Sequence, residues 1–182
     1  MARGFVTLSA KIEGLAEIER RLSAMPVVIQ RRILRGALRA GARVFRRHMV
    51  QEVPISGERR LDYTGLAPKI PGDLRRSIRV GKPYIDRGRL SITTKAGNDK
   101  AFYAHMVEVG VRPHTISRRR NLGRSRNVLV IARQFVSGPV RHPGFAGRFF
   151  ARSALASGEG PAVLAFRNYF DNRVQQYWAT GK

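Results

Sequence analysis

Arginine is the residue type whose number and spacing most clearly suggest chemistry in this sequence. The chain has 35 lysines and arginines against 12 acidic residues, a net charge of +23, and only six of the 35 are lysines, which leaves 29 arginines. Guanidinium groups form planar, bidentate contacts with phosphates and carboxylates. Two segments hold the excess, since residues 20–51 contain nine arginines, residues 109–158 contain ten, and neither contains an acid. A polyanion or an acidic protein is therefore the expected partner.

The densest cationic run lies in a polar segment with Pro113 and Gly123, residues 111–126, which is predicted to be a basic loop. One interpretation is a contact with nucleic-acid phosphates or with an acidic protein surface, and the other is a solvated loop. Residues 112–134 contain no Phe, Trp or Tyr, so base stacking is not indicated. The candidate contact residues are Arg118, Arg119, Arg120, Arg124 and Arg126.

Patterns typical of catalytic and metal sites are missing. The histidines have no spacing typical of metal ligands, and the chain has no cysteine. It contains no nucleophile elbow, phosphate-binding glycine loop or carboxylate pair. We therefore expect no enzyme activity, no metal and no cofactor, with a nuclease or toxin as the weakest interpretation. The four histidines are His48, His105, His114 and His142.

One acidic residue stands alone in this basic background. Glu108 is the single carboxylate between Lys100 and Gly158. We expect it to pair with an arginine, within the chain or across an interface, and not to act as a catalyst.

A long amphipathic helix is predicted over residues 26–52. Pro26 suits the first turn of a helix, and Pro54 favours an extended conformation at Val53, which ends it. Such a helix is roughly 40 Å long, so other elements must pack along it. Its apolar face contains Leu34, Leu38, Gly41, Phe45 and Met49. The neighbouring face contains Arg31, Arg35, Arg39, Arg43 and Arg46, of which the first four are candidates for contact with DNA or a partner protein; a solvated face is the alternative.

The remaining segments predict a single α+β domain over residues 1–182, with residues 53–73 as an extended loop or arm. No apolar run approaches the ~20 residues that span a bilayer, and the N-terminus lacks the apolar block of a signal peptide, so we expect no membrane partner.

Predicted strands cover residues 4–12, 77–86, 88–97 and 127–137, with a hairpin turn near residues 86–88 and a turn at residues 138–144. Predicted helices cover residues 15–22, a short turn capped by Asp73, residues 99–110 with Asp99 as N-cap and Gly110 as stop, residues 145–158, and an amphipathic helix over 161–180 beginning at Pro161.

Several motifs follow one another in an order that is similar to a known family. IEGLAEIERRL precedes the long helix, and it is followed by GDLRRSIRV at residues 72–80, YAHMVEVG at 103–110 and VRHPGFAGRFFARSAL at 140–155. This succession resembles the neck or tail-completion proteins of long-tailed bacteriophages, which are also described as minor tail components.

The resemblance implies an α+β protomer in which the long helix lies across a small antiparallel β-sheet, with a C-terminal helix and no catalytic residues. The residues it assigns to fold or interface positions fall into three groups. Leu74 and Ile78 would be core; Tyr103, Val107 and Glu108 would hold the middle segment to the sheet; His142, Pro143 and Gly144 would fix the turn that delivers Phe149 and Phe150 into the core.

The resemblance also implies a function at the head–tail junction of the virion. The protein would assemble in the host cytoplasm as a ring, usually sixfold, that joins the head connector to the tail and surrounds the DNA passage. Its neighbours would be head-closure or connector proteins and tail-terminator or tail-tube proteins, reached by residues 53–73 and 111–126. The alternative, from charge alone, is a sequence-nonspecific nucleic-acid-binding protein.

Overall fold

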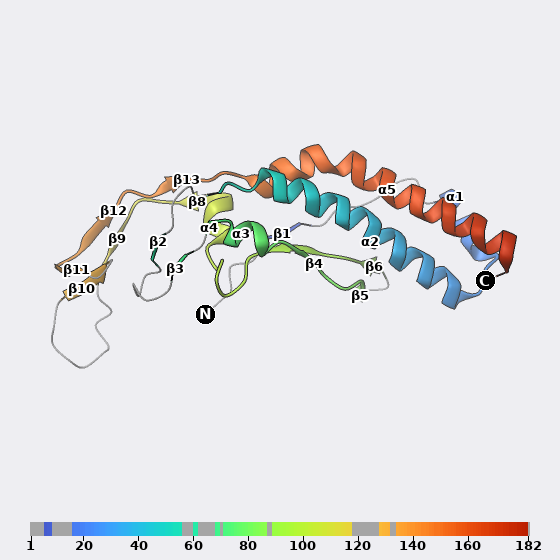
Figure 1. Ribbon diagram of the computed structural model, residues 1–182, viewed down its shortest axis with the longest axis horizontal. Helices are drawn as coiled ribbons and strands as arrows, with labels where there is room; N and C mark the ends of the chain where they lie inside the picture. Colours follow the sequence, from blue (N-terminus) through green and yellow to red (C-terminus); the bar gives the residue numbers. More distant parts are fainter. Residues whose placement is uncertain are drawn as a thin grey trace.

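Two long antiparallel helices form the spine of the molecule, and a small sheet lies against one of them (Figure 1). The computed structural model describes residues 6–8, 16–55, 60–61, 68–69, 71–86, 89–117, 128–131 and 134–181. The predicted α+β class, with a long helix, a small antiparallel sheet and a C-terminal helix, is confirmed. The helices are α1 (Ala16–Ser23), α2 (Val27–Glu52), α3 (Asp73–Arg76), α4 (Ala104–Val109) and α5 (Phe150–Thr180).

All strand pairs in the described residues are antiparallel, and three strands form the sheet in the order β1-β7-β4. The remaining strands form two-stranded pairs: β2 with β3, β5 with β6, β8 with β13, β9 with β12 and β10 with β11. Their bounds are β1 Val6–Leu8, β2 Arg60–Leu61, β3 Pro68–Lys69, β4 Arg79–Val80, β5 Tyr84–Asp86, β6 Arg89–Ser91, β7 Thr94–Ala96, β8 Gly110–Val111, β9 His114–Ile116, β10 Val128–Ile131, β11 Gln134–Ser137, β12 Val140–His142 and β13 Phe145–Ala146.

The hairpin predicted around residues 77–97 is present, with a bulge in the middle. Val80 faces Thr94 and Tyr84 faces Ser91, so three residues on one strand oppose two on the other. The backbone N–H of Gly81 still donates to the Thr93 carbonyl at 2.7 Å, which extends the β4–β7 pairing by one residue. The extra residue explains why each predicted strand divides into two short ones.

The predicted helix over residues 26–52 is confirmed within one residue. Pro26 is its N-cap residue, and Val53, the residue before Pro54, is extended, as the restriction imposed by a following proline requires. The helix buries Ile33, Ala37, Gly41, Ala42 and Met49. One side packs against α5, and the helix also contacts β4, β6 and β7.

Glycines set the close approach of α2 and α5. A Cβ atom on Gly36 would overlap the ring of Tyr169, and one on Gly41 would lie 2.8 Å from the carbonyl oxygen of Ala162. Because backbone atoms cannot move aside as a flexible side chain can, the helices could not keep this spacing with a larger residue at Gly41.

Replacing Gly41 with valine is therefore expected to lower the free energy of unfolding by about 1–3 kcal/mol through overpacking. The matched control is Gly160→Ala in α5, where nothing lies within 4 Å of the added methyl group and alanine's better helix propensity is expected to leave stability unchanged or up to about 1 kcal/mol higher. Urea unfolding measures both. An unchanged midpoint for Gly41→Val would contradict the close packing.

Two apolar clusters form the core. The first joins the end of α2, α3, the sheet, α4 and the start of α5, and the second lies between α1, the first half of α2 and the second half of α5. The first contains Met49, Val53, Leu74, Ile78, Ala96, Ala101, Ala104, Phe150, Ala151 and Ala154. The second contains Leu22, Met25, Ile33, Ala37, Phe166, Phe170 and Val174.

The C-terminal part of the chain is one helix, so the prediction of two helices separated before Pro161 is wrong. Helix α5 runs through Pro161. Gly158, the last residue of the predicted helix over 145–158, is buried against the ring of His48, where its missing Cβ makes room for the α2 side chain. The helix continues because residues on both sides of the proline belong to the core clusters, which outweighs the hydrogen bond that proline removes.

The predicted strand over residues 127–137 is a hairpin instead. β10 and β11 pair antiparallel, with Ile131 facing Gln134. The sequence concealed this reversal because the two residues between the strands, Ala132 and Arg133, are not typical turn residues. The predicted turn at residues 138–144 is also wrong in part, since Val140–His142 forms β12 and pairs with β9.

The two predicted helix caps differ from the structure. Gly72, with a φ of 84°, is the N-cap of α3, and Asp73 is its first residue. Tyr103 and not Asp99 is the N-cap of α4. Asn98 organises that turn, since its side-chain oxygen accepts hydrogen bonds from the backbone N–H groups of Lys100 and Ala101.

Candidate functional site

Helix α2 presents a continuous face of exposed arginines, which we call the arginine face. Within the described residues, none of its arginines forms an ion pair with an acid, and Arg46 Nε donates to the backbone carbonyl of Ile78 at 2.8 Å. Unpaired guanidinium groups along one side of a rod produce a field that attracts polyanions. The arginine face consists of Arg31, Arg32, Arg35, Arg39, Arg43, Arg46 and Arg47.

The structure places all four predicted contact residues of the long helix on this exposed face. Arg32 and Arg47 belong to it as well and were missed. The signal was present, because at 100° per residue Arg32 falls between Arg35 and Arg43 on the helical circumference.

Three antiparallel strand pairs, β8–β13, β9–β12 and β10–β11, follow one another in the described part of residues 110–146, and we call them the β-ribbon. Val111 faces Phe145 and Ile116 faces Val140 in one register, and Val128 faces Ser137 further along. Figure 1 shows the β-ribbon extending from α4 away from the two long helices. A two-stranded hairpin is marginally stable alone, so this element is suited to packing on a partner.

The predicted basic loop therefore begins as strand, because residues 111 and 114–116 belong to β8 and β9. The arginine-rich remainder lies between β9 and β10 in the sequence, whereas β11 and β12 are separated by only Gly138 and Pro139. Its candidate residues Arg118, Arg119, Arg120, Arg124 and Arg126 lie outside the described residues, so their contact with DNA or a partner stays a prediction. In the predicted arm at residues 53–73, β2 and β3 pair, and most of the remaining residues between Ile55 and Pro71 lie outside the described part.

Three glycines bring the backbones together at the root of the β-ribbon. Gly110 and Gly144 have φ values of 82° and 77°, which only glycine adopts without strain. A Cβ on Gly110 would lie 2.5 Å from the Gly147 nitrogen, one on Gly147 would lie 2.5 Å from the Glu108 oxygen, and one on Gly144 would overlap the Val111 oxygen. The root is therefore closely packed through its main chain.

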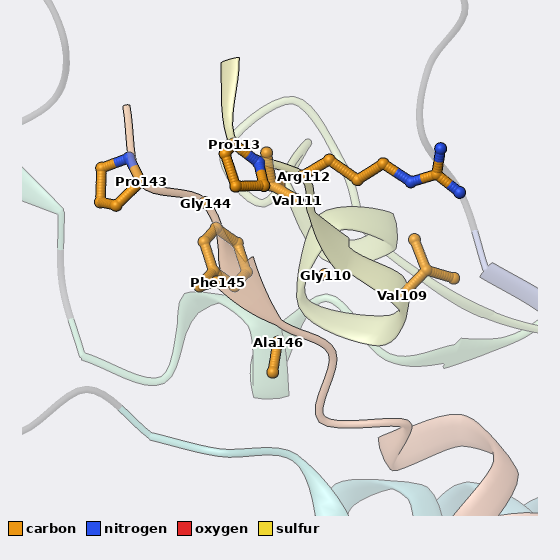
Figure 2. A pocket seen from close by; sticks show the side chains of 9 residues that line it. All are labelled: Val109, Gly110, Val111, Arg112, Pro113, Pro143, Gly144, Phe145 and Ala146. Atoms are coloured by element: carbon orange, nitrogen blue, oxygen red, sulfur yellow. The ribbon is translucent and has the colours of Figure 1, made fainter. Parts of the chain in front are cut away.

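A hollow of about 600 Å³ opens at this root (Figure 2). Residues 109–113, from the end of α4 through β8, line one side of it, and residues 143–146, which include β13, line the other. Val109 and Phe145 in this lining are 56% and 48% exposed. The hollow is thus mostly apolar, with Arg112 as its charged member.

A pair of histidines lies across the β-ribbon just beyond the hollow. His114 faces His142 in the register, and their rings stack with centroids 5.0 Å apart. The backbone N–H of Gly144 donates to His142 Nδ1 at 3.0 Å, which is how these two members of the predicted turn act together. The pairing was missed because the strands themselves were not predicted there.

Glu108 caps helix α5 from a distant part of the chain. Its Oε2 atom accepts a hydrogen bond of 2.8 Å from the backbone N–H of Ala151, in the first turn of α5. Residue Phe149, the N-cap of α5, makes no side-chain cap of its own. The expected arginine partner, Arg152, approaches only to 4.0 Å and is largely exposed, so the backbone contact and the positive helix terminus hold this buried carboxylate.

Replacing Glu108 with alanine is expected to lower the free energy of unfolding by about 1–3 kcal/mol, because the Ala151 N–H loses its acceptor. Glu108→Gln keeps an acceptor and loses only the charge, so a smaller loss of about 0.5–1 kcal/mol is expected. Chemical denaturation measures the two variants side by side. Equal losses for both would show that the charge, and not the hydrogen bond, stabilises the junction.

The other predicted fold residues occupy the first core cluster or its border. Leu74 and Ile78 are buried, and Tyr103 and Val107 are half-buried against the cluster. Phe150 is also buried, but Phe149 is 42% exposed, with the Arg152 guanidinium 4.9 Å from its ring centroid. The expectation that both phenylalanines enter the core is therefore wrong for Phe149, because the chain turns through a left-handed conformation there, with φ 48°.

Burial raises the pKa of the Tyr103 phenol above its ordinary value of 10.0, and the Asp73 carboxylate raises it further while Arg76 opposes the shift. The unfolded phenol then loses its proton from about pH 10 while the folded phenol keeps it, so stability falls as the pH rises above that value. We expect wild type to lose stability relative to Tyr103→Phe between pH 8 and pH 10.5 in urea unfolding. A constant difference would contradict this.

Neither a metal centre nor a membrane helix is found in the described part of the chain. No three His, Cys, Asp or Glu residues gather there as a group that could hold a metal ion. None of the described helices combines the length and apolar character needed to cross a bilayer.

Comparison with known proteins gives one finding. The model of the HK97-gp10-like family, described as "Bacteriophage HK97-gp10, putative tail-component", matches residues 16–110. This range begins with α1 and ends at Gly110, the first glycine of the β-ribbon root. It therefore includes the arginine face, the hairpin of residues 77–97 and Glu108. No curated protein and no solved structure matches the chain.

Proposed function

Because the chain belongs to the HK97-gp10-like family of bacteriophage tail components, we propose that it is a structural virion protein of the head–tail junction that joins the head connector to the tail. Membership in this family makes the protein a component of the phage tail. We further propose that it lies at the head–tail junction and catalyses no reaction.

The arginine face is the observation that supports this position most strongly. A tail component at the junction surrounds the path of the genome, and seven exposed arginines on one rigid helix suit contact with phosphates. Such contacts position DNA without reading its sequence. In this proposal the protein forms a ring, sixfold by resemblance to related neck proteins, with the arginine face toward the bore.

The partners in this proposal are other copies of the chain, head-closure or connector proteins on one side, and tail-terminator or tail-tube proteins on the other. The β-ribbon supports this assignment because it leaves the helical body and offers edges that a neighbour can cover (Figure 1). The segment at residues 53–73 is the second candidate for such contacts.

Labelling of purified particles tests the position. A gold-labelled antibody against the chain should bind at the point where head meets tail, in electron micrographs of intact particles or of particles dissociated at the neck. Label distributed along the tail tube, or confined to the distal tip, would contradict the proposal.

A sequence-nonspecific nucleic-acid-binding protein is the second candidate, favoured by the net charge of +23. The free protein would then bind duplex DNA with an affinity that falls steeply with salt concentration, and it would be absent from purified particles. Its presence in particles at a fixed copy number would favour the structural role.

A further inference from the structure

The hollow at the root of the β-ribbon has the properties of a docking site, and its floor is fixed before anything binds. The glycine contacts described above bring the backbones of the two sides close together. The backbone N–H groups of Arg148 and Phe149 donate to the carbonyls of Val107 and Glu108, at 2.8 and 3.0 Å, and tie the root to α4. Because the site is preorganised, a ligand would not have to order it on binding.

The walls of the hollow are apolar side chains that the protein leaves partly exposed. Val109 is the last residue of α4 and Phe145 lies on β13, and Pro113 and Pro143 extend the apolar lining. A volume of about 600 Å³ is in the range of small-ligand pockets and accommodates one or two large side chains. An aromatic or large aliphatic side chain is the group that such a surface binds.

The charge around the hollow determines which residues can flank the apolar side chain of the ligand. Arg112 lines the hollow, Arg148 is exposed at the adjoining turn, and residues 109–158 contain no acid. The nearest carboxylate in the sequence, Glu108, is turned inward onto the Ala151 N–H. The field at the hollow is therefore positive, and it favours acidic residues on either side of the apolar side chain.

We propose that the hollow between residues 109–113 and 143–146 binds a segment of a neighbouring protein in which an aromatic or large aliphatic side chain is flanked by aspartate or glutamate. A second copy of this chain is disfavoured at the hollow because it offers only 12 acidic residues against 35 lysines and arginines. Duplex DNA is disfavoured because a rigid duplex cannot place an apolar group in a concave site of this size. This inference rests on the proposed function in one respect, which is that the neighbouring protein is a component of the same virion.

The test uses synthetic peptides and the full-length protein. Four fluorescein-labelled peptides of eleven residues each have one central residue between two flanks of equal length: phenylalanine between acids, alanine between acids, phenylalanine between serines, and phenylalanine between lysines. In fluorescence anisotropy at about 0.15 M salt, where surface charges are partly screened, the acidic phenylalanine peptide should bind at least about tenfold tighter than each of the others. In amide NMR spectra, its binding should shift Gly110, Val111, Gly144 and Phe145.

Two variants and two matched controls locate the site. Phe145→Ser and Arg112→Glu should each weaken binding of the acidic phenylalanine peptide about tenfold or more, whereas Leu164→Ser and Arg167→Glu, which change exposed residues of α5, should not. Circular dichroism checks that all four fold. Equal binding of the phenylalanine and alanine peptides would show attraction by charge alone and overturn the proposal, as would binding unaffected by Phe145→Ser or no binding of any peptide.

The same spectra decide between the other occupants. Self-association that Phe145→Ser abolishes would assign the hollow to a second copy, and displacement of the peptide by duplex DNA at the same amides would assign it to nucleic acid. Either result overturns the proposal. Because these measurements need no particle, they can fail while the labelling experiment succeeds, and the reverse.

Discussion

Replacing Phe150 with alanine is expected to lower the free energy of unfolding by about 3–5 kcal/mol. Its side chain is 1% exposed and lies in the first core cluster, where α5 begins against Met49, Leu74 and Ile78. Truncation leaves a cavity at the point where the end of α2, the sheet and α5 meet. Urea unfolding followed by circular dichroism measures the loss.

Phe149→Ala is the matched control for this change, since it removes the same side chain one residue earlier. Phe149 is exposed, and the Arg152 guanidinium lies over its ring. We expect a loss of less than about 1 kcal/mol for this change. If the two variants lose similar stability, the turn before α5 does not separate the two phenylalanines as the structure shows.

Reversing three charges of the arginine face, with Arg35→Glu, Arg39→Glu and Arg43→Glu together, is expected to weaken duplex DNA binding by about two orders of magnitude at 0.15 M salt. These side chains are exposed along one side of α2 and have no acidic partner among the described residues. The slope of log affinity against log salt concentration should also become shallower, by the amount that corresponds to the loss of roughly three phosphate contacts. Filter binding or anisotropy over a salt series measures both quantities.

The control variant has the same change in net charge, but at residues outside the arginine face. Lys82→Glu, Lys100→Glu and Arg167→Glu together also reduce the net charge from +23 to +17, by two for each reversal, and all three residues are exposed away from α2. We expect less than about a fivefold effect from this variant. Equal effects from the two triple variants would mean that total charge, and not the arginine face, attracts the duplex.

The long helix could be predicted from the sequence because its signals are local. Pro26 and Pro54 set its ends, and its apolar spacing predicted which face would be buried. The hairpin of residues 77–97 was similarly accessible from its alternation and its turn residues. Its one-residue bulge was not, because a bulge depends on which residues of the two strands pair.

The failures share a cause, which is tertiary contact overriding local signals. Pro161 and Gly158 are strong helix-breaking residues, yet α5 continues because both of its halves are held against α2. The reversal between Ile131 and Gln134 is visible only as a pairing of strands. In each case the deciding partner lies far away in the sequence or carries no turn signal of its own.

The candidate sites divide in the same way. The arginine face follows from helical geometry, so Arg31, Arg35, Arg39 and Arg43 could be placed in advance. The other sites join residues that are far apart in the sequence. His114 and His142 are 28 positions apart, and the hollow and the capping of α5 by Glu108 each bring together residues that are 30 or more positions apart. Single-sequence periodicity has no access to such pairings.

Electron microscopy of lysates from a phage or induced prophage that lacks this gene tests the central claim most directly. If the protein joins head to tail, the lysate should contain DNA-filled heads and complete tails that are not attached to each other, and supplying the intact chain should restore joined, infectious particles. Joined particles of normal appearance in the absence of the protein would contradict a role at the head–tail junction.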